Sequence, residues 1–299
     1  MKKIVFFGCT LSAYELLKFL IKKKIKISAV FTKKKSYNHD FINLTNIAKK
    51  NKIFSTYIKK TNSNLTIEKL KKIKPDYIIC IGWPVLLKKN IIDIPKYDVI
   101  GFHPTELPKN KGRHPIIWSI VLGLKTTASS FFLIKDPNKP DNGELISQRR
   151  VIIKNNYTSK NLYLKLINVA SNQLYEIVKK IYKNKLKIYK KKISHPGNTW
   201  RKRSKEDGKI DWRMSIKSIN NLTRALTPPY PYAYFVYKRK EMSVIKTKII
   251  LNKNKYFNIE PGRIVLYQGV NPVVKCADGL IKLYVKNKNF KPKKGESLN

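Results

Sequence analysis

The chain has 299 residues, of which 42% are hydrophobic, so it is long and apolar enough to fold and is not a disordered polymer. Its 64 Lys and Arg residues outnumber its 18 Asp and Glu residues and give a formal net charge of +46. Such a charge has two interpretations: attraction to a polyanion, or a Lys-rich composition of the kind that AT-rich genomes encode. The lysines are scattered along the whole chain, which favours the second interpretation and argues against a dedicated nucleic-acid-binding protein. A basic surface would still favour a phosphate-bearing substrate.

The cysteines and the apolar runs indicate a compartment. Cys9, Cys80 and Cys276 are far apart and have no CxxC spacing, so the sequence predicts neither disulfides nor a metal site and fits a reducing environment. The apolar run in the opening MKKIVFFGC is too short for a signal peptide, and no stretch approaches the ~18 apolar residues of a membrane span. We therefore expect a cytoplasmic protein without membrane association.

Strand-like and helix-like segments alternate through the first half of the chain. The run DYIICIG is apolar on both faces, as a central parallel strand should be. Such alternation is typical of an open, mostly parallel, Rossmann-like α/β sheet. The predicted strands are 3–8, 25–32, 54–58, 76–82, 98–103, 126–134 and 149–154. The predicted helices are 12–20 with Ser12 as its cap, 42–50, 66–73, 85–92, 115–123 and 159–184.

The composition changes after the long helix. Residues 185–212 are basic, contain few apolar residues and predict a linker with fixed contacts of its own. A helix at 216–226 and the Pro-rich TPPYPYAYFVY are followed by four short β-like runs, SVIKTKIIL, GRIVLY, PVVKCA and LIKLYV, which are typical of a small β-barrel-like (OB-like) domain. We therefore divide the chain into an α/β domain at 1–184, a linker at 185–212 and a small C-terminal domain at 213–299.

One histidine and two aspartates follow strands that we expect to be near one another. His103 comes directly after DVIGF, and Gly82 and Trp83 come at the end of the DYIICIG strand. In an open α/β sheet, ligands bind beyond the carboxyl ends of the strands. The loop KDPNKPDNGE, which follows the strand TTASSFFLI, carries Asp136 and Asp141. We expect these side chains to converge on one crevice.

A His beside an Asp is the minimal pair for general base catalysis, because the Asp orients the imidazole and stabilises its charged form. The chain has no GxSxG motif, which favours direct attack by a substrate nucleophile over a covalent intermediate. Two structural alternatives stay open: His103 as an ordinary histidine at a strand end, and Asp141 as a turn residue in DNG. The segment GCTLSA lacks GxGxxG, so no dinucleotide site is predicted.

Several motifs together indicate a family. HPTELPKNKGRHPIIWSI resembles the HPSLLPxxRGxxPIxWAI stretch of the folate-dependent formyltransferases, and DNGELI resembles their DxGDI motif. The opening KIVFFG, the strand DYIICIGW and the late WRKRSKEDGKIDW also resemble members of that family, so the resemblance runs from Met1 to about Val285. It implies a formyltransferase catalytic domain at 1–184.

The resemblance implies transfer of a formyl group from 10-formyltetrahydrofolate to an amine, with His103 as general base and Asp141 as its partner. The residues expected at the folate are Gly82, Trp83, Val85, Leu86 and Asp136. The residues expected at the acceptor are Thr105, Lys109, Arg113, His114 and Tyr230, and Lys111 lies among the basic ones that could reach a diphosphate. A second role for His114, capping the helix that begins at Pro115, stays open.

The chain departs from the family pattern at one position. Gly101 stands where the family usually has an Asn, two residues before the His, which is thought of as an oxyanion-stabilising donor. Loss of one such donor typically costs about 10²- to 10³-fold in rate. Either another group replaces it, or activity is weak or absent.

The acceptor amine distinguishes the members of the family. The segment FTKKKSYNHDF lacks the Gly- and Arg-rich insertion usual in methionyl-tRNA formyltransferases, whereas PYPYAYFVY and IIWSI look more like the sugar N-formyltransferases. We therefore expect an amino-sugar N-formyltransferase that acts on a nucleotide-linked substrate in glycan biosynthesis. Two alternatives stay open: a methionyl-tRNA formyltransferase, which the charge of +46 would suit, and a non-catalytic homologue that binds sugar or folate. An exposed apolar face of the β domain would indicate a homodimer.

Overall fold

The structure is a computed structural model that describes residues 2–36, 40–188, 197–250 and 256–298. It contains two compact units, each built from segments that are discontinuous in the sequence. The first unit comprises Met1–Pro115, Thr127–Val151 and Leu164–Trp200, and the second comprises Ile116–Thr126, Ile152–Tyr163 and Arg201–Asn299. The domain limits expected from the sequence are continuous and stay a prediction.

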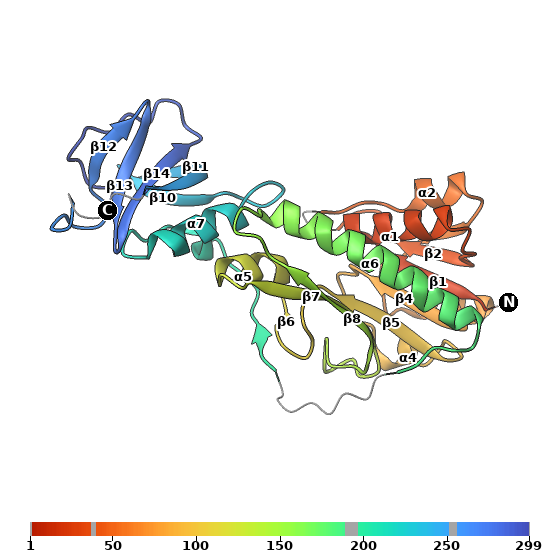
Figure 1. Cartoon of the computed structure of the whole chain (residues 1–299). Coiled ribbons are helices and arrows are strands. Elements are labelled where there is room, and N and C mark those ends of the chain that lie inside the picture. Colours follow the sequence, from red (N-terminus) through yellow and green to blue (C-terminus); the bar gives the residue numbers. More distant parts are fainter. Residues whose placement is uncertain (1, 37–39, 189–196, 251–255, 299) are drawn as a thin grey trace. The chain divides into compact units, whose positions relative to one another are not determined.

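The first unit is built on a seven-stranded sheet with the order β3-β2-β1-β4-β5-β7-β8 (Figure 1). The five strands from β3 to β5 are parallel, and β7 runs antiparallel to β5. The strands are β1 (Ile4–Gly8), β2 (Ala29–Thr32), β3 (Phe54–Tyr57), β4 (Tyr77–Ile81), β5 (Asp98–His103), β7 (Thr126–Leu133) and β8 (Leu145–Ile152). The mostly parallel α/β sheet predicted from the sequence is confirmed.

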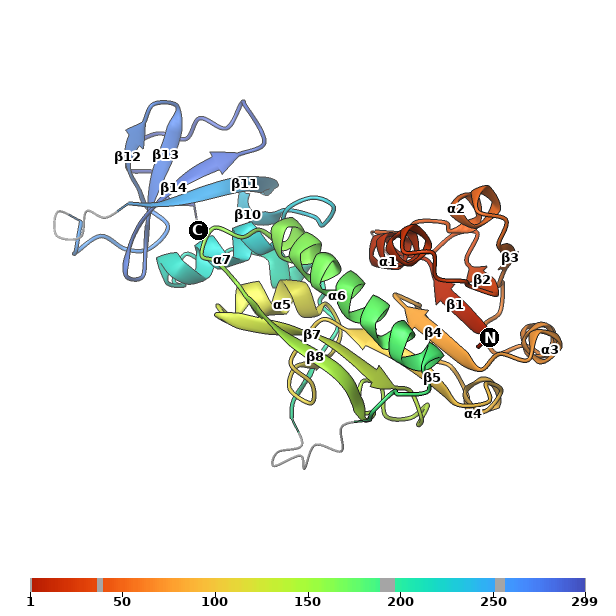
Figure 2. The ribbon, with the colours of Figure 1, turned by 45° about the vertical axis from the view of Figure 1, so that its right-hand side comes forward.

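Helices cover both faces of this sheet (Figure 2). The helices α3 (Asn64–Ile73) and α4 (Lys89–Ile92) pack on one face, where Leu70 and Ile91 join a buried cluster with Val5 and Phe7 of β1. On the other face, α1 (Leu11–Lys22) lies beside the long α6 (Ser159–Tyr182), and the ring centroids of Phe19 and Tyr175 are 6.3 Å apart. Every residue of β1 and β4 is buried, which is the burial that strands apolar on both faces require.

Two expected helix starts were wrong, and each has a local cause. The cap of α1 is Thr10, whose side chain accepts a hydrogen bond from the backbone of Ala13, and Ser12 lies inside the helix. The helix expected at 85–92 is reduced to α4, because the Asn62 side chain donates to the carbonyl of Leu86 and accepts from the backbone of Lys88. These backbone groups are therefore bound outside a helix.

Several other boundaries moved by a few residues. The strand β2 begins at Ala29 rather than at Ile25, because the backbone N–H of Ile25 donates to Leu20 and still belongs to the end of α1. The strand β8 begins at Leu145 rather than at Arg149. The helix α2 is Thr45–Lys50.

The second unit contains an antiparallel sheet with the order β10-β11-β14-β13-β12 and the helix α7 (Ile216–Ala225), which packs on β11. Its strands are β10 (Ala233–Tyr237), β11 (Lys240–Ile250), β12 (Ile264–Gln268), β13 (Asn271–Cys276) and β14 (Gly279–Val285). Trp212, Phe235 and Phe290 pack edge to face in its core. A small, separate β domain at the C-terminal end is thus confirmed.

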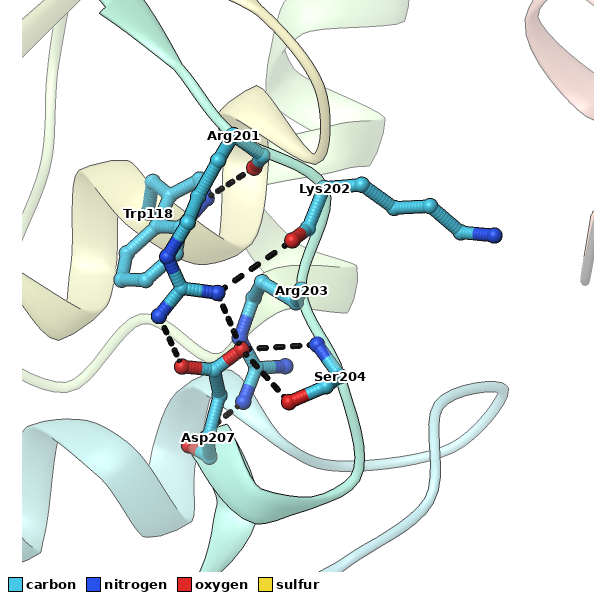
Figure 3. Close-up of polar contacts among 6 residues, drawn as sticks. All are labelled: Trp118, Arg201, Lys202, Arg203, Ser204 and Asp207. Carbon is cyan, nitrogen blue, oxygen red and sulfur yellow. Dashed lines mark hydrogen bonds and ion pairs between the residues drawn. The ribbon is translucent and has the colours of Figure 1, made fainter.

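The linker makes specific contacts within the second unit (Figure 3). The indole of Trp118, on α5 (Pro115–Val121), donates to the carbonyl of Arg201 at 3.0 Å, and the Arg201 and Arg203 guanidinium groups lie 5.3 and 5.7 Å from its ring centroid. Asp207, in the 3₁₀ turn η1 (Glu206–Gly208), binds both terminal nitrogens of Arg201 and accepts from the backbone of Ser204 at 2.7 Å. Residues 201–207 of the basic linker are therefore fixed by one partly buried carboxylate and one indole.

Among the described residues, no helix has both the length and the apolar character that crossing a membrane requires.

Candidate active site

A cavity of about 550 Å³ lies in the first unit, next to the ends of β4 and β5 and the loop after β7. Its volume is in the range of pockets that hold small ligands. The five residues expected at the folate all line it: Gly82, Trp83, Val85, Leu86 and Asp136. His103 and Asp141 line it as well. Val85 and Leu86 are 42% and 58% exposed, so the cavity has apolar surface for a ligand to cover.

His103 is the last residue of β5 and is buried. Its Nδ1 lies 3.4 Å from Oδ1 of Asp141, and its Nε2 lies 3.2 Å from the carbonyl oxygen of Asn110. Burial lowers the pKa of His103, while Asp141 and the Asn110 carbonyl act in the opposite direction. The imidazole is therefore neutral at neutral pH, and both of its nitrogens face hydrogen-bond acceptors.

Asp141 reaches His103 because the loop after β7 turns back. The antiparallel pairing places Ser130 opposite His103 and Leu133 opposite Ile100, so β7 ends away from the histidine. The loop returns and closes where the backbone of Leu133 donates to the carbonyl of Glu144 at 2.9 Å. At Gly143 a Cβ would lie 1.6 Å from the carbonyl oxygen of Leu133, so only glycine fits this closure.

The Asp141 carboxylate has a second contact that fixes its position. Its Oδ2 accepts a hydrogen bond from the backbone N–H of Gly112 at 3.1 Å. Asp141 itself has a φ of +57°, in the left-handed region, which Asp tolerates better than most residues. Asp141 therefore lies in a turn, and in the same position its carboxylate contacts His103.

Gly101 lies on β5 and lines the cavity. A Cβ at this position would lie 2.9 Å from the Ile134 side chain and 2.9 Å from the ring tip of Phe132. Side chains of the neighbouring strand and loop therefore occupy the space that a larger residue would need. An Asn at this position would require both neighbours to move.

Trp83 lines the cavity and is held in place by contacts with three other residues. Its indole N–H donates to the Thr61 hydroxyl at 3.2 Å, and its ring meets Phe7 edge to face at 5.0 Å between centroids. The ammonium of Lys33 lies 5.2 Å from the ring centroid. The indole is thus held in one orientation at the cavity wall.

The residues expected at the acceptor have different positions. Thr105 is fully buried and donates to the carbonyl of Lys109 at 3.1 Å, so it fixes the loop from inside. Arg113 is exposed, and its backbone N–H donates to Trp200 at 3.0 Å. His114 has a φ of +51° just before α5. Tyr230 belongs to the second unit, where its backbone N–H donates to Thr227 in a turn.

Sequence reasoning missed a two-residue ladder beside the histidine loop. The strand β6 (Lys111–Gly112) pairs in parallel with β9 (Thr199–Trp200), which comes from the predicted linker. The Asn198 side chain accepts from the backbone of Asn110 at 2.9 Å. The sequence signal for this ladder was the glycine at 112. In the structure its φ is +98°, and it lies so close to the backbone of Trp200 that a side chain would not fit.

Comparison with protein families gives two matches. The family described as formyl transferase matches residues 1–178. The family described as formyl transferase, C-terminal domain, matches residues 202–296. The two matches together cover most of the chain.

Two relatives illustrate the sequence similarity. The bifunctional polymyxin resistance protein ArnA of Wigglesworthia glossinidia brevipalpis is 32% identical over 275 residues, which is 91% of this chain and 40% of that protein. The methionyl-tRNA formyltransferase of Clostridium beijerinckii is 33% identical over 215 residues, which is 72% of this chain and 67% of that protein. The chain therefore spans less than half of the length of the first relative and about two thirds of the second.

Two solved structures share the fold. The N-formyltransferase from Helicobacter canadensis, in complex with folinic acid and dTDP-3-aminofucose, superposes with a TM-score of 0.73 at 20% identity and covers 95% of this chain and 100% of that one. The methionyl-tRNA formyltransferase from Clostridium thermocellum superposes with a TM-score of 0.60 at 19% identity and covers 85% of this chain and 95% of that one.

Proposed function

Because this chain belongs to the formyl transferase family, as its motifs predicted, we propose that it moves a formyl group from 10-formyltetrahydrofolate to the amine of a nucleotide-linked amino sugar. The observation that carries the chemical step is the contact between His103 and Asp141 at the cavity. A buried neutral imidazole with a carboxylate partner is suited to take a proton from an attacking amine.

The acceptor amine attacks the formyl carbon directly, and its proton passes to His103. The bond between the formyl carbon and N10 of the folate then breaks, N10 takes a proton, and tetrahydrofolate leaves. The Asp141 carboxylate is a stronger acceptor than a backbone carbonyl, so it favours the tautomer with hydrogen on Nδ1 and leaves the lone pair on Nε2. The amine delivers its proton to Nε2 beside the Asn110 carbonyl oxygen, which lies 3.2 Å away and accepts from the new N–H. The imidazolium that forms has an acceptor at each nitrogen, Asp141 at Nδ1 and the Asn110 carbonyl at Nε2. Both contacts stabilise it.

The cavity fits a folate co-substrate. It combines the apolar side chains of Val85 and Leu86 with the indole of Trp83 and with polar groups of the loop that carries Asp136. A flat heterocycle would cover the exposed apolar surface and meet polar atoms at its edge. When bound, 10-formyltetrahydrofolate supplies the formyl group, and these residues orient it toward His103.

The sugar acceptor rests on the motif resemblance and on the fold shared with an N-formyltransferase that was solved with dTDP-3-aminofucose. The basic side chains Lys109, Lys111 and Arg113 follow His103 in the sequence and provide the charge that a diphosphate needs. A cytoplasmic location and a homodimer stay predictions. In this proposal the reaction belongs to glycan biosynthesis.

Methionyl-tRNA is the second candidate acceptor. The methionyl-tRNA formyltransferase of Clostridium beijerinckii is 33% identical over 72% of this chain, and the net charge of +46 would attract an RNA backbone. The scattered lysines and the missing Gly- and Arg-rich insertion favour the sugar. A third candidate, binding without catalysis, is suggested by Gly101.

One assay separates the three. Consumption of 10-formyltetrahydrofolate is followed by absorbance with UDP-, dTDP-, GDP- and CMP-linked amino sugars in one set and with methionyl initiator tRNA in the other. Turnover with a sugar supports the proposal, and turnover with tRNA alone replaces it with the second candidate. Folate binding without turnover in either set supports the binding role. The His103→Ala variant shows whether any turnover depends on the proposed base, and Asp93→Asn, an exposed carboxylate paired with Lys89, is the matched control.

A further inference from the structure

We propose that Asn198 is a positioning residue for His103: it holds the carbonyl of Asn110 against Nε2 of the imidazole and thereby tunes the basicity of the histidine. The inference rests on the proposed function of His103 as general base. It assigns a positioning role to a residue in the middle of the linker, which the motifs at 101–115 do not include.

Asn198 is attached to the histidine loop by both its side chain and its backbone. Its Oδ1 accepts from the backbone N–H of Asn110 at 2.9 Å, across 88 residues of sequence. Its carbonyl accepts from the backbone N–H of Lys111 at 3.0 Å. The ladder between β6 and β9 continues this attachment, and Arg113 donates to Trp200 at 3.0 Å. The loop is therefore held from outside along its whole second half.

The loop is held from two sides. Asn110 itself has a φ of +62°, in the left-handed region, which Asn tolerates better than most residues. Thr105 anchors the loop from inside by its bond to the Lys109 carbonyl. Gly197 approaches so closely from outside that a Cβ there would lie 2.0 Å from the Pro108 carbonyl oxygen. The Asn110 carbonyl is thus set between an inner and an outer anchor.

The same segment supports the second acceptor of the imidazole. Gly112, which pairs with Trp200, donates its N–H to Oδ2 of Asp141 at 3.1 Å. Among the charged groups of the described residues, Asp141 is the one that acts on His103, and the Asn110 carbonyl is the uncharged acceptor that adds to it. Both partners of His103 are therefore connected to the segment 197–200.

This arrangement predicts how the histidine responds when the Asn198 side chain is removed. The Asn110 carbonyl would then be held only by the backbone contacts of Asn198 and the ladder, so its contact with Nε2 would weaken. The pKa of the imidazolium should therefore decrease by about 0.5, which is part of the change of up to about 1 that losing one whole ordinary hydrogen bond would cause. A base displaced by a fraction of an ångström should also lower kcat by about tenfold with a smaller effect on KM.

The experiment compares Asn198→Ala with Asn198→Asp, which keeps an acceptor oxygen at the same position. Lys202→Ala is the matched control, because Lys202 is an exposed linker residue whose side chain points away from the contacts drawn in Figure 3. The titration of His103 is followed by NMR of protein with labelled histidine, and its signal is assigned as the one missing in His103→Gln. A salt concentration of about 0.5 M screens the added charge of the Asp.

We expect Asn198→Ala to lower the pKa of His103, and we expect Asn198→Asp and Lys202→Ala to leave it near the wild-type value. An unchanged pKa in Asn198→Ala overturns the proposal. A decrease that Asn198→Asp fails to restore, with thermal unfolding lowered in both, also overturns it in favour of a general structural role. The titration needs no acceptor substrate, so its outcome is independent of whether the proposed formyl transfer is observed.

Discussion

Gly112 donates its backbone N–H to Oδ2 of Asp141, so the loop that follows His103 also holds the carboxylate partner of that histidine. The other carboxylate oxygen, Oδ1, faces Nδ1 of His103 at 3.4 Å. Asp141 therefore bridges two segments of the site. This arrangement requires both its charge and its position on a loop that returns from the end of β7.

The charge of Asp141 should be needed for the rate more than for the fold. We expect Asp141→Asn to lower kcat by about 10²- to 10⁴-fold, because the amide keeps the size of the side chain but does not stabilise an imidazolium. His103→Ala should show a loss in the same range. Steady-state kinetics of both single variants and of the double variant test this. If the two groups act as one unit, the double variant loses little more than either single variant, whereas fully additive losses would contradict the pairing.

The activity should fall at acid pH with a midpoint below 6.5. Burial lowers the pKa of His103 from its ordinary value of 6.5, and the base is active only when neutral, so activity is lost as pH decreases through that lowered pKa. The pH profile of kcat/KM measures the midpoint. Asp141→Asn should move it to still lower pH, since the carboxylate favours the charged imidazole. A midpoint above 6.5 that the variant leaves in place would assign the acid limb to another group.

Adding a side chain at position 101 should destabilise the first unit. We expect Gly101→Ala to lower the free energy of unfolding by about 1–3 kcal/mol, because its Cβ would press on Ile134 and Phe132. Chemical denaturation measures the change. Ile134→Ala in the same chain removes one of the two contacts and should recover part of the loss. If Gly101→Ala unfolds like the wild type, the packing around this strand is looser than the structure indicates.

Asp207 should stabilise the linker in a pH-dependent manner. The Arg201 guanidinium beside it holds the pKa of the Asp207 carboxyl well below its ordinary value of 3.8. A carboxyl with a lowered folded-state pKa stabilises the fold fully above the unfolded pKa, and this contribution is lost as pH falls from there through the folded value. Because the Arg201 side chain is 65% exposed, we expect Asp207→Asn to cost only about 1 kcal/mol at neutral pH.

Thermal unfolding of wild type and Asp207→Asn between about pH 3 and pH 7 measures this contribution. The difference between the two proteins should be constant in the upper part of the range and should shrink below about pH 4. A difference that stays the same at the acid end would mean that the carboxylate charge is not what stabilises the linker.

Local sequence patterns predicted the elements that carry strong periodic signals. The runs that became β1 and β4 are apolar throughout, and they were placed correctly because burial on both faces leaves no polar position in them. The strand β5 was found from the apolar residues between Asp98 and His103. The helix α6 was predicted by its long amphipathic pattern. The helix expected at 85–92 was wrong, because one distant side chain, Asn62, binds the backbone groups that a helix would have used.

In the candidate site, too, some features were predicted from the sequence and others were not. The residues at the ends of β4 and β5 were expected at one crevice, since the carboxyl ends of neighbouring parallel strands meet at one edge, and they line one cavity. The antiparallel direction of β7 was not foreseen, and it means that the loop must turn back for Asp141 to reach His103. The ladder between β6 and β9 has two residues on each side and carries no periodic signal.

The sequence by itself determined the fold class, the family and the pair of residues on which the proposed chemistry rests, because burial patterns and motif spacing are local properties of the chain. Tertiary structure alone decided what surrounds that pair. The contact of Asn198 with Asn110 spans 88 residues. The crowding at Gly101 depends on two side chains of another strand and loop. Contacts between segments so far apart depend on how the chain is packed, and no local pattern encodes them.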